Sequence, residues 1–243
     1  MSFIDVAQRL AVRYAAPELQ GGSLRQLANG VATAHQQISA YKDFWAEHNQ
    51  RALAATGPLW VVLGDSTAQG IGASDPMRGY VGQVHAELTA RTGQPWRVLN
   101  LSVSGATSLD VLNDQLPQLD GLGDAPQLVT CSVGGNDLSD LSPRVVHRTF
   151  RALIAALPDC AMIFDLPVPV GLYWGIGRAV SPYVAGVNTT IRAAAARRGI
   201  SVVAYSRSYT RPWRGKFAAD RFHPSDRGYR DATRAVLEEL GYA

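Results

Sequence analysis

A serine, an aspartate and a histidine stand where they could form a nucleophilic triad. Ser66 lies in a glycine-bounded segment at 64–70, directly after an apolar run at 59–63. Asp220 and His223 stand three residues apart near the other end of the chain. Serine is a weak nucleophile until a neighbouring base takes its proton, and a carboxylate can orient that base. We therefore expect Ser66 as nucleophile, His223 as general base and Asp220 as the group that orients the base.

Two further segments carry groups that could stabilise an oxyanion. Gly105 ends the segment 100–105, in which polar residues alternate with Leu101 and Val103, and Asn136 follows a glycine pair at 134–135. Attack on a carbonyl carbon places negative charge on oxygen, which requires preorganised hydrogen-bond donors. The backbone N–H groups of Ser66 and Gly105 and the side-chain amide of Asn136 suit that role. Glycine at position 105 would let the backbone approach the oxyanion without an intervening side chain.

Each of these pieces alone has an ordinary structural explanation. A Gly-Asp-Ser sequence occurs by chance, and a Gly-Gly-Asn-Asp sequence is typical of a turn. A single aspartate is commonly a surface carboxylate, and a single histidine is commonly structural. The combination in this order, with three of the pieces after consecutive predicted strands, favours catalysis.

The chain from residue 58 onward alternates between predicted strands and helices. We expect strands near 59–63, 97–101, 127–133, 160–166 and 200–204, and helices near 79–91, 109–119, 143–156, 181–198 and 225–240. This alternation predicts right-handed crossovers and a parallel sheet covered on both faces. Ligands bind such sheets beyond the carboxyl ends of the strands. Ser66, Gly105 and Asn136 each follow a different predicted strand, so we expect them at that edge, with His223 returning there before the last helix.

These blocks resemble the SGNH superfamily, also called the GDSL hydrolases. The matching residues are Gly64-Asp65-Ser66 with Gly70, then Gly105, then Gly134-x-Asn136-Asp137, then Asp220-x-x-His223-Pro224. The resemblance covers residues 59 to about 240 and implies a flavodoxin-like, three-layer α/β/α fold with a five-stranded parallel sheet. It implies Ser66 as nucleophile, Asp220 and His223 as the other triad members, and Gly105 and Asn136 in the oxyanion hole. Asn100 matches an asparagine common in the family, and we expect it to support the loop rather than to react.

The first 57 residues lie outside the resemblance. We interpret residues 1–57 as a helical N-terminal extension of a hydrolase domain at 58–243. Apolar residues at helical spacing predict a short helix near 3–14, and a capping-box signal at Ser23 and Gln26 precedes a longer amphipathic helix. The apolar seam of that helix consists of Leu24, Leu27, Val31, Ala34, Ile38, Tyr41 and Trp45. We expect the seam to pack on its own domain, with a homodimer through these helices as the alternative.

Composition and charge exclude several classes of partner. The formal net charge is only +3 and the basic residues are scattered, so we expect no nucleic acid. Cys131 and Cys160 are too few for a disulfide framework. No apolar run reaches the roughly 20 residues that span a bilayer, and no signal-peptide pattern is visible. We therefore expect a cytoplasmic protein without a transmembrane segment.

Metal catalysis and the α/β-hydrolase fold are poorly supported by the residues. Four histidines fall singly on predicted helices, without a partner at ligand spacing: His35, His48, His85 and His147. We therefore expect neither a metal nor a cofactor. The α/β-hydrolase nucleophile needs the pattern Gly-x-Ser-x-Gly, whereas Thr67 and Ala68 follow Ser66.

The substrate is less well defined by the sequence. A long apolar segment at 165–177 follows the fourth predicted strand, where it could line an acyl pocket, form a lid or pack on the domain. It favours a small-molecule or lipid-like ester over a sugar ester. A carbohydrate O-acetylesterase and an acyltransferase on the same site are alternatives. A non-catalytic binding or scaffold protein, with the N-terminal helices as its interaction surface, is the alternative from another class.

Overall fold

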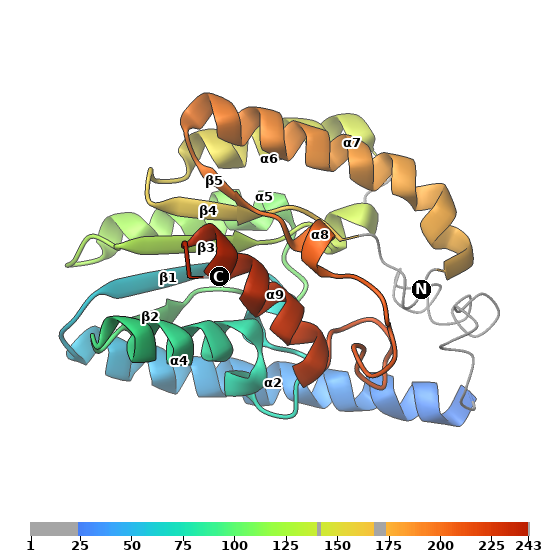
Figure 1. Cartoon of the computed structure of the whole chain (residues 1–243), viewed down its shortest axis with the longest axis horizontal. Coiled ribbons are helices and arrows are strands. Elements are labelled where there is room, and N and C mark those ends of the chain that lie inside the picture. Colours follow the sequence, from blue (N-terminus) through green and yellow to red (C-terminus); the bar gives the residue numbers. More distant parts are fainter. Residues whose placement is uncertain (1–23, 140–141, 168–173, 243) are drawn as a thin grey trace.

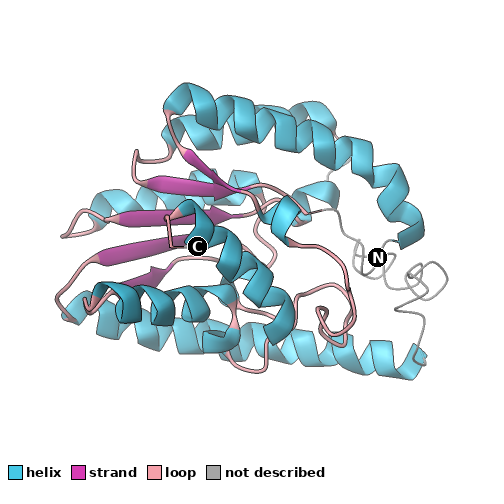
Figure 2. Cartoon of the chain, in the orientation of Figure 1, coloured by secondary structure: helices cyan, strands magenta, loops and turns pink. Residues whose placement is uncertain are grey.

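A computed structural model of the chain describes residues 24–139, 142–167 and 174–242. In this part of the chain five strands form one sheet: β1 (Leu59–Gly64), β2 (Arg97–Asn100), β3 (Leu128–Ser132), β4 (Ala161–Phe164) and β5 (Ser201–Val203). Their order is β2-β1-β3-β4-β5, and every neighbouring pair is parallel. This is the flavodoxin-like order. The sheet lies between layers of helices (Figure 2), which confirms the predicted fold class.

Side chains of β1 alternate between two hydrophobic cores, because successive residues of a strand point to opposite faces of the sheet. Leu59, Val61 and Leu63 join one core, and Trp60 and Val62 join the other. The first core is covered by η3 (Val111–Gln115), η4 (Leu116–Gly121), α6 (Pro143–Ala156) and α7 (Trp174–Arg198). The short helix α5 (Ser108–Asp110) leads directly into η3. The second is covered by α4 (Tyr80–Thr92), α8 (Tyr205–Ser208) and α9 (Asp226–Glu239).

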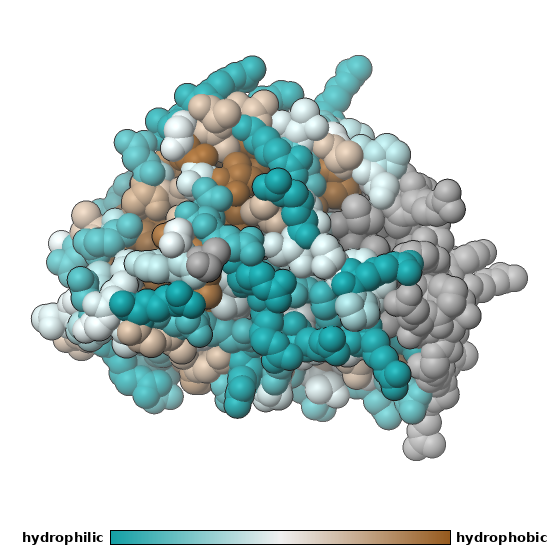
Figure 3. Space-filling model, viewed as in Figure 1, coloured by the Kyte–Doolittle hydropathy of each residue, from teal (hydrophilic) through white to brown (hydrophobic). Residues whose placement is uncertain are grey.

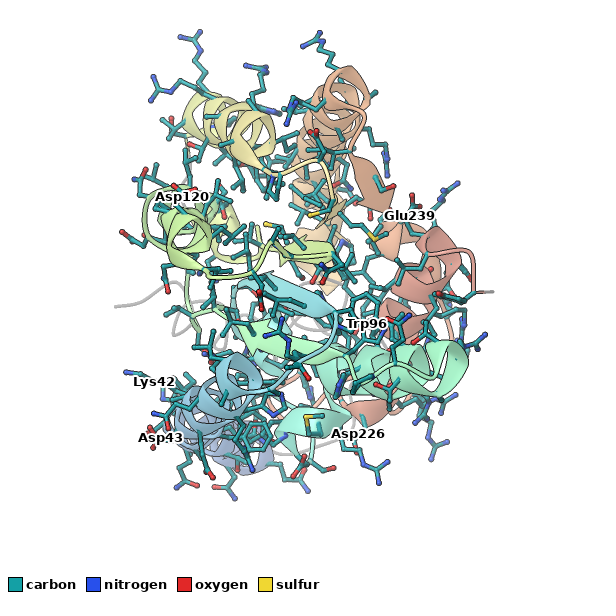
Figure 4. All side chains as sticks on the ribbon, turned by 90° about the vertical axis from the view of Figure 1, so that its left-hand side faces the viewer. Lys42, Asp43, Trp96, Asp120, Asp226 and Glu239 are labelled. Carbon is teal, nitrogen blue, oxygen red and sulfur yellow. The ribbon has the colours of Figure 1, made fainter. Side chains whose placement is uncertain are left out.

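The N-terminal helix α2 (Leu24–Ala54) lies along the β2 edge of the sheet and extends past the carboxyl ends of the strands (Figure 1). Four residues of its predicted seam are buried against the domain: Leu27, Ala34, Tyr41 and Trp45. Lys42 and Asp43 point away from the sheet (Figure 4). The seam therefore packs on its own domain, as expected. The helix expected near 3–14 and the cap at Ser23 lie outside the described residues.

Two helices differ from the sequence-based expectation. Residues 109–119 are helical but irregular, because α5, the π-helical η3 and the 3₁₀-helical η4 follow one another there. Pro117 near the start of η4 cannot donate a backbone N–H and would clash inside a regular helix. Helix α7 begins at Trp174 rather than near 181, with Pro182 inside it. The end of the apolar segment 165–177 is therefore helical, and its part 168–173 lies outside the described residues.

Helix α9 follows the predicted base His223 directly and fixes the end of its loop. The Ser225 hydroxyl caps the helix by accepting the Gly228 backbone N–H. Tyr229 is buried in the core, whereas the outer surface of α9 is hydrophilic (Figure 3). The buried face therefore anchors the segment that carries His223.

No helix in the described part of the chain has the length and apolar character that a bilayer span requires.

Candidate active site

Ser66 and His223 lie 157 residues apart in the sequence but within hydrogen-bond distance in space. The Nε2 atom of His223 is 2.9 Å from Ser66 Oγ, and its Nδ1 atom is 2.6 Å from Asp220 Oδ2. A carboxylate only accepts hydrogen bonds, so Nδ1 carries the proton and Nε2 of the neutral ring accepts from the hydroxyl. Asp220 Oδ1 also accepts the backbone N–H groups of Phe222 and His223, each at 3.0 Å. A continuous chain of hydrogen bonds thus runs from carboxylate to hydroxyl.

Ser66 is held at the start of the one-turn helix α3 (Ser66–Gln69), immediately beyond β1. Asp65 caps this helix, because its Oδ1 atom accepts the Thr67 backbone N–H at 2.9 Å. Gly64 has a φ of +145°, and a Cβ at this position would lie 2.1 Å from the Ser132 carbonyl oxygen. Only glycine allows the chain to approach β3 so closely before it turns. The strand end and the cap together fix the direction of the nucleophile.

Gly105 lies on the loop after β2, and Asn136 begins the 3₁₀ helix η5 (Asn136–Ser139) after β3. A hydrogen bond joins these two segments. The Asn136 side-chain nitrogen donates to the Ala106 carbonyl oxygen at 2.9 Å. Gly105 is exposed with a φ of +88°, a left-handed conformation that disfavours other residues. The backbone N–H groups of Ser66 and Gly105 have no acceptor among the described residues. Three donors are thus present on neighbouring loops of the carboxyl edge.

Asp137 also connects these two loops. Its carboxylate accepts the Ser108 backbone N–H at 2.9 Å and the Ser108 hydroxyl. Burial raises the pKa of the Asp137 carboxyl above its ordinary range. The carboxylate thus fixes the loop of Asn136 relative to the loop of Gly105. The sequence indicated Asp137 only as part of the Asn-Asp pair and did not indicate this role.

Gln69 and Asn100 connect the nucleophile helix to the loop after β2. The Gln69 amide donates to the Ser102 carbonyl at 2.9 Å and accepts from the Ser104 hydroxyl at 2.6 Å. The Asn100 amide donates to the Ala68 carbonyl at 2.9 Å and accepts from the Ser102 backbone N–H at 3.1 Å. Asn100 therefore lies where a loop-supporting residue was expected. Gln69 was not predicted, although it stands next to Gly70 in the nucleophile segment.

The cysteine and histidine side chains outside the candidate site form no group of three possible metal ligands among the described residues. Cys131 and Cys160 are free thiols, and burial raises the pKa of each. Within residues 24–139, 142–167 and 174–242, no three histidine, cysteine or acidic side chains are grouped as metal ligands. Among these residues, the serine, histidine and aspartate that the sequence predicted as a triad are joined by hydrogen bonds.

Asp65 leads to a prediction about stability and pH. Burial raises its pKa from 3.8 to about 6, although the bond from Thr67 and the nearby His223 act in the opposite direction. Because the folded-state pKa is the higher one, the stabilisation is complete below about pH 4 and is lost as pH rises through about 6. The asparagine of an Asp65→Asn variant can keep the helix cap but cannot ionise. We expect wild type to lose on the order of 2–3 kcal/mol relative to this variant between pH 4 and pH 7.

Urea unfolding of both proteins at the two pH values measures this difference, and the contributions of groups common to both proteins largely cancel. A change of zero, or a gain in the stability of wild type relative to the variant as pH rises, would contradict the assigned burial cost of Asp65.

Comparison with known proteins identifies the family of this chain. A model of the GDSL-like lipase/acylhydrolase family matches residues 62–230. The range includes all five expected site residues: Ser66, Gly105, Asn136, Asp220 and His223. A search of curated proteins finds no match.

Solved structures with the same fold include enzymes of several kinds. TesA is 24% identical with a TM-score of 0.62, over 75% of this chain and 97% of that chain. The α/β hydrolase LAE5 from the metagenome of Lake Arreo, Spain, is 23% identical with a TM-score of 0.60, over 77% and 97%. The acetylxylan esterase Axe2 from Geobacillus stearothermophilus is 20% identical with a TM-score of 0.59, over 78% and 96%. At these identities the likeness shows the fold.

Proposed function

Because the chain belongs to the GDSL-like lipase/acylhydrolase family and is a carboxylic ester hydrolase of that type, we propose that it cleaves acyl esters through a Ser66–His223–Asp220 triad. The observation that carries this proposal is the hydrogen-bonded chain of 2.6 Å and 2.9 Å from Asp220 through His223 to the Ser66 hydroxyl. It joins the three groups in the order that nucleophilic catalysis by serine needs.

In the first half of the reaction, His223 Nε2 takes the Ser66 proton while Oγ attacks the ester carbonyl carbon. Asp220 accepts from Nδ1 and stabilises the imidazolium that forms. The imidazolium then gives its proton to the departing alcohol oxygen, and an acyl-Ser66 ester remains. In the second half, His223 takes a proton from water, the resulting nucleophile attacks the acyl carbon, and the carboxylic acid leaves as Ser66 regains its proton.

The oxyanion formed in both halves is bound by three donors in this proposal: the backbone N–H groups of Ser66 and Gly105 and the side-chain amide of Asn136. Two observations support this assignment of donors. The backbone N–H groups of Ser66 and Gly105 have no acceptor among the described residues, and the Asn136 amide is oriented by the Ala106 carbonyl. Donors fixed before the reaction stabilise charge at little cost of reorganisation.

The Asn136→Ala variant tests this hole. An oxyanion donor acts on charge that develops in the transition state, so we expect kcat to fall about 10²- to 10³-fold with a much smaller change in KM. Steady-state kinetics with a small aryl ester measure both constants. Asn113→Ala, which removes an exposed amide from η3, is the matched control. A rise in KM alone would assign Asn136 to substrate binding instead.

Two exposed apolar side chains favour an aliphatic acyl group as substrate. Val103 is 56% exposed and Leu109 is 46% exposed, and they lie on either side of Gly105 in the chain. Large apolar side chains at a ligand edge gain free energy when a ligand covers them. We therefore propose a small-molecule or lipid-like ester whose acyl chain lies against Val103 and Leu109.

A series of p-nitrophenyl esters from acetate to decanoate, together with acetylated xylo-oligosaccharides, tests the proposed substrate. We expect kcat/KM to rise with acyl length, and Val103→Ser or Leu109→Ser to reduce that rise. Leu53→Ser, at an exposed apolar position on α2, is the control. Preference for the acetylated sugars would indicate a carbohydrate O-acetylesterase, and product formed only with an added alcohol would indicate an acyltransferase. Complete inactivity on all esters would contradict the proposed function.

A further inference from the structure

Four side chains of α2 form a polar stripe that faces the candidate active site. Gln37, Tyr41, Trp45 and Asn49 recur at every fourth residue, so they lie on one side of the helix. All four are bonded to backbone groups of segments at the carboxyl edge of the sheet. The match to the family begins at residue 62, so this helix precedes it. In the comparisons with LAE5 and TesA, about three quarters of this chain aligns with 97% of the other chain.

The first half of the stripe holds the segment that follows Ser66. Gln37 Oε1 accepts the Gly72 backbone N–H, and Gln37 Nε2 donates to the Ala73 carbonyl, each at 2.9 Å. The Tyr41 hydroxyl donates to the same carbonyl at 2.7 Å. Tyr41 is 7% exposed, and burial raises its pKa to about 12, so the hydroxyl stays a neutral donor. These three bonds fix the backbone of residues 72–73 against α2.

Residues 72–73 in turn lie against the predicted base. A Cβ at Gly72, which has a φ of +93°, would lie 2.6 Å from His223 Cβ. Gly72 therefore lies in direct backbone contact with the side chain of His223 on one side and bonds to Gln37 on the other. Helix α2 also contacts the loop that carries Asp220 and His223, because a Cβ at Gly30 would lie 2.6 Å from the Asp220 backbone nitrogen.

The second half of the stripe supports the loop of Gly105. The Trp45 indole N–H donates to the Gln69 carbonyl at 3.0 Å. The Asn49 side chain donates to the Asn100 carbonyl and accepts the Asn100 backbone N–H, each at 2.8 Å. As described above, the side chains of Gln69 and Asn100 hold the loop that ends at Gly105. One helix therefore contacts the supports of the nucleophile, the base and the oxyanion loop.

We propose that α2 is a positioning element of the active site, in which Gln37 and Tyr41 hold residues 72–73 so that His223 stays in hydrogen-bond contact with Ser66. The inference rests on the proposed function, because positioning has a measurable meaning only for a reacting triad. A misplacement of about 1 Å can cost on the order of 10²-fold in rate. A helix that only stabilised the fold would change the unfolding temperature and leave the rate of the folded protein unaltered.

The experiment compares Gln37→Leu and Tyr41→Phe with Lys42→Ala on the outer side of the same helix. Leucine has a similar size and removes the bonds of Gln37 to Gly72, Ala73 and Tyr41. Phenylalanine at position 41 removes only the hydroxyl. We expect Gln37→Leu to lower kcat for an aryl ester about 10- to 100-fold with KM nearly unchanged, and Tyr41→Phe to lower it less. Lys42→Ala should stay within about twofold of wild type, as exposed substitutions commonly do. All rates are taken where circular dichroism shows fully folded protein.

A second measurement separates positioning from substrate binding and from stability. The rate at which a fluorophosphonate labels Ser66 should fall for Gln37→Leu in parallel with kcat. Wild-type kcat and labelling rates in both variants, whatever their unfolding temperatures, would overturn the inference. If Gln37→Leu does not fold, Tyr41→Phe decides the question by the same two rates. A wild-type protein that neither hydrolyses esters nor reacts with the fluorophosphonate would contradict the proposed function instead.

Discussion

The Ser66→Ala variant should hydrolyse a p-nitrophenyl ester at least about 10⁴-fold more slowly than wild type, because the oxyanion donors remain but no nucleophile does. The fold should persist. Ser66 is buried at the first position of α3, where the cap comes from Asp65 and alanine is a good helix former. Loss of one hydroxyl leaves the donors and the His223–Asp220 pair in place.

Initial rates of p-nitrophenol release, with circular dichroism as the check on folding, measure this effect. Ser39→Ala, at an exposed serine of α2, is the control and should behave as wild type. A folded Ser66→Ala protein with activity near that of wild type would remove Ser66 from the nucleophile role.

The Asp220→Asn variant should lower kcat by about 10⁴-fold while keeping the geometry of the loop. The asparagine carbonyl can still accept the two backbone N–H groups that Asp220 Oδ1 accepts at 3.0 Å. Its amide, however, presents a donor to His223 Nδ1. The ring then carries its proton on Nε2, facing Ser66, and cannot take the serine proton.

Asp226→Asn provides the matched control for this substitution. Asp226 begins α9 and binds the Ser74 backbone N–H and hydroxyl at 2.7 Å each, so it is an acid of the same region that does not touch His223. We expect a small change in kcat for it. A similar, small loss for Asp220→Asn and Asp226→Asn would contradict the role assigned to Asp220.

The main features of the fold were predictable because they follow from local patterns. Alternating apolar strands and amphipathic helices predicted a parallel sheet, and α6 occupies the expected residues Pro143–Ala156. The errors arose where one residue type admits two interpretations. A helix was expected from about residue 181, but α7 begins at Trp174 and Pro182 lies inside it. Proline is commonest in the first turn of a helix, so its position gives no sign of the earlier start.

Much of the candidate site was also predictable, since the carboxyl ends of parallel strands meet at one edge. That rule brings Ser66, Gly105 and Asn136 together from the sequence alone, and a loop before α9 supplies Asp220 and His223. Their chemical roles stay predictions until they are measured.

The contacts of α2 could not be predicted from the sequence. Tyr41 and Trp45 were recognised only as apolar seam residues, and their hydroxyl and indole N–H were not assigned partners. Gln37 and Asn49 are polar, so the sequence alone suggests that they face solvent. Their bonds to the backbone of distant segments depend on tertiary packing, which local patterns do not reveal. The signal that could have indicated these contacts is that Gln37 and Asn49 continue the four-residue spacing of Tyr41 and Trp45, which places all four on one side of the helix.

Covalent labelling of the wild-type protein by a fluorophosphonate, followed by peptide mass spectrometry, would identify the nucleophile itself. We expect one adduct, on Ser66, that forms much more slowly in a folded His223→Ala variant. An adduct on another residue, or no adduct on a protein that still hydrolyses esters, would contradict the assignment of Ser66 as the nucleophile.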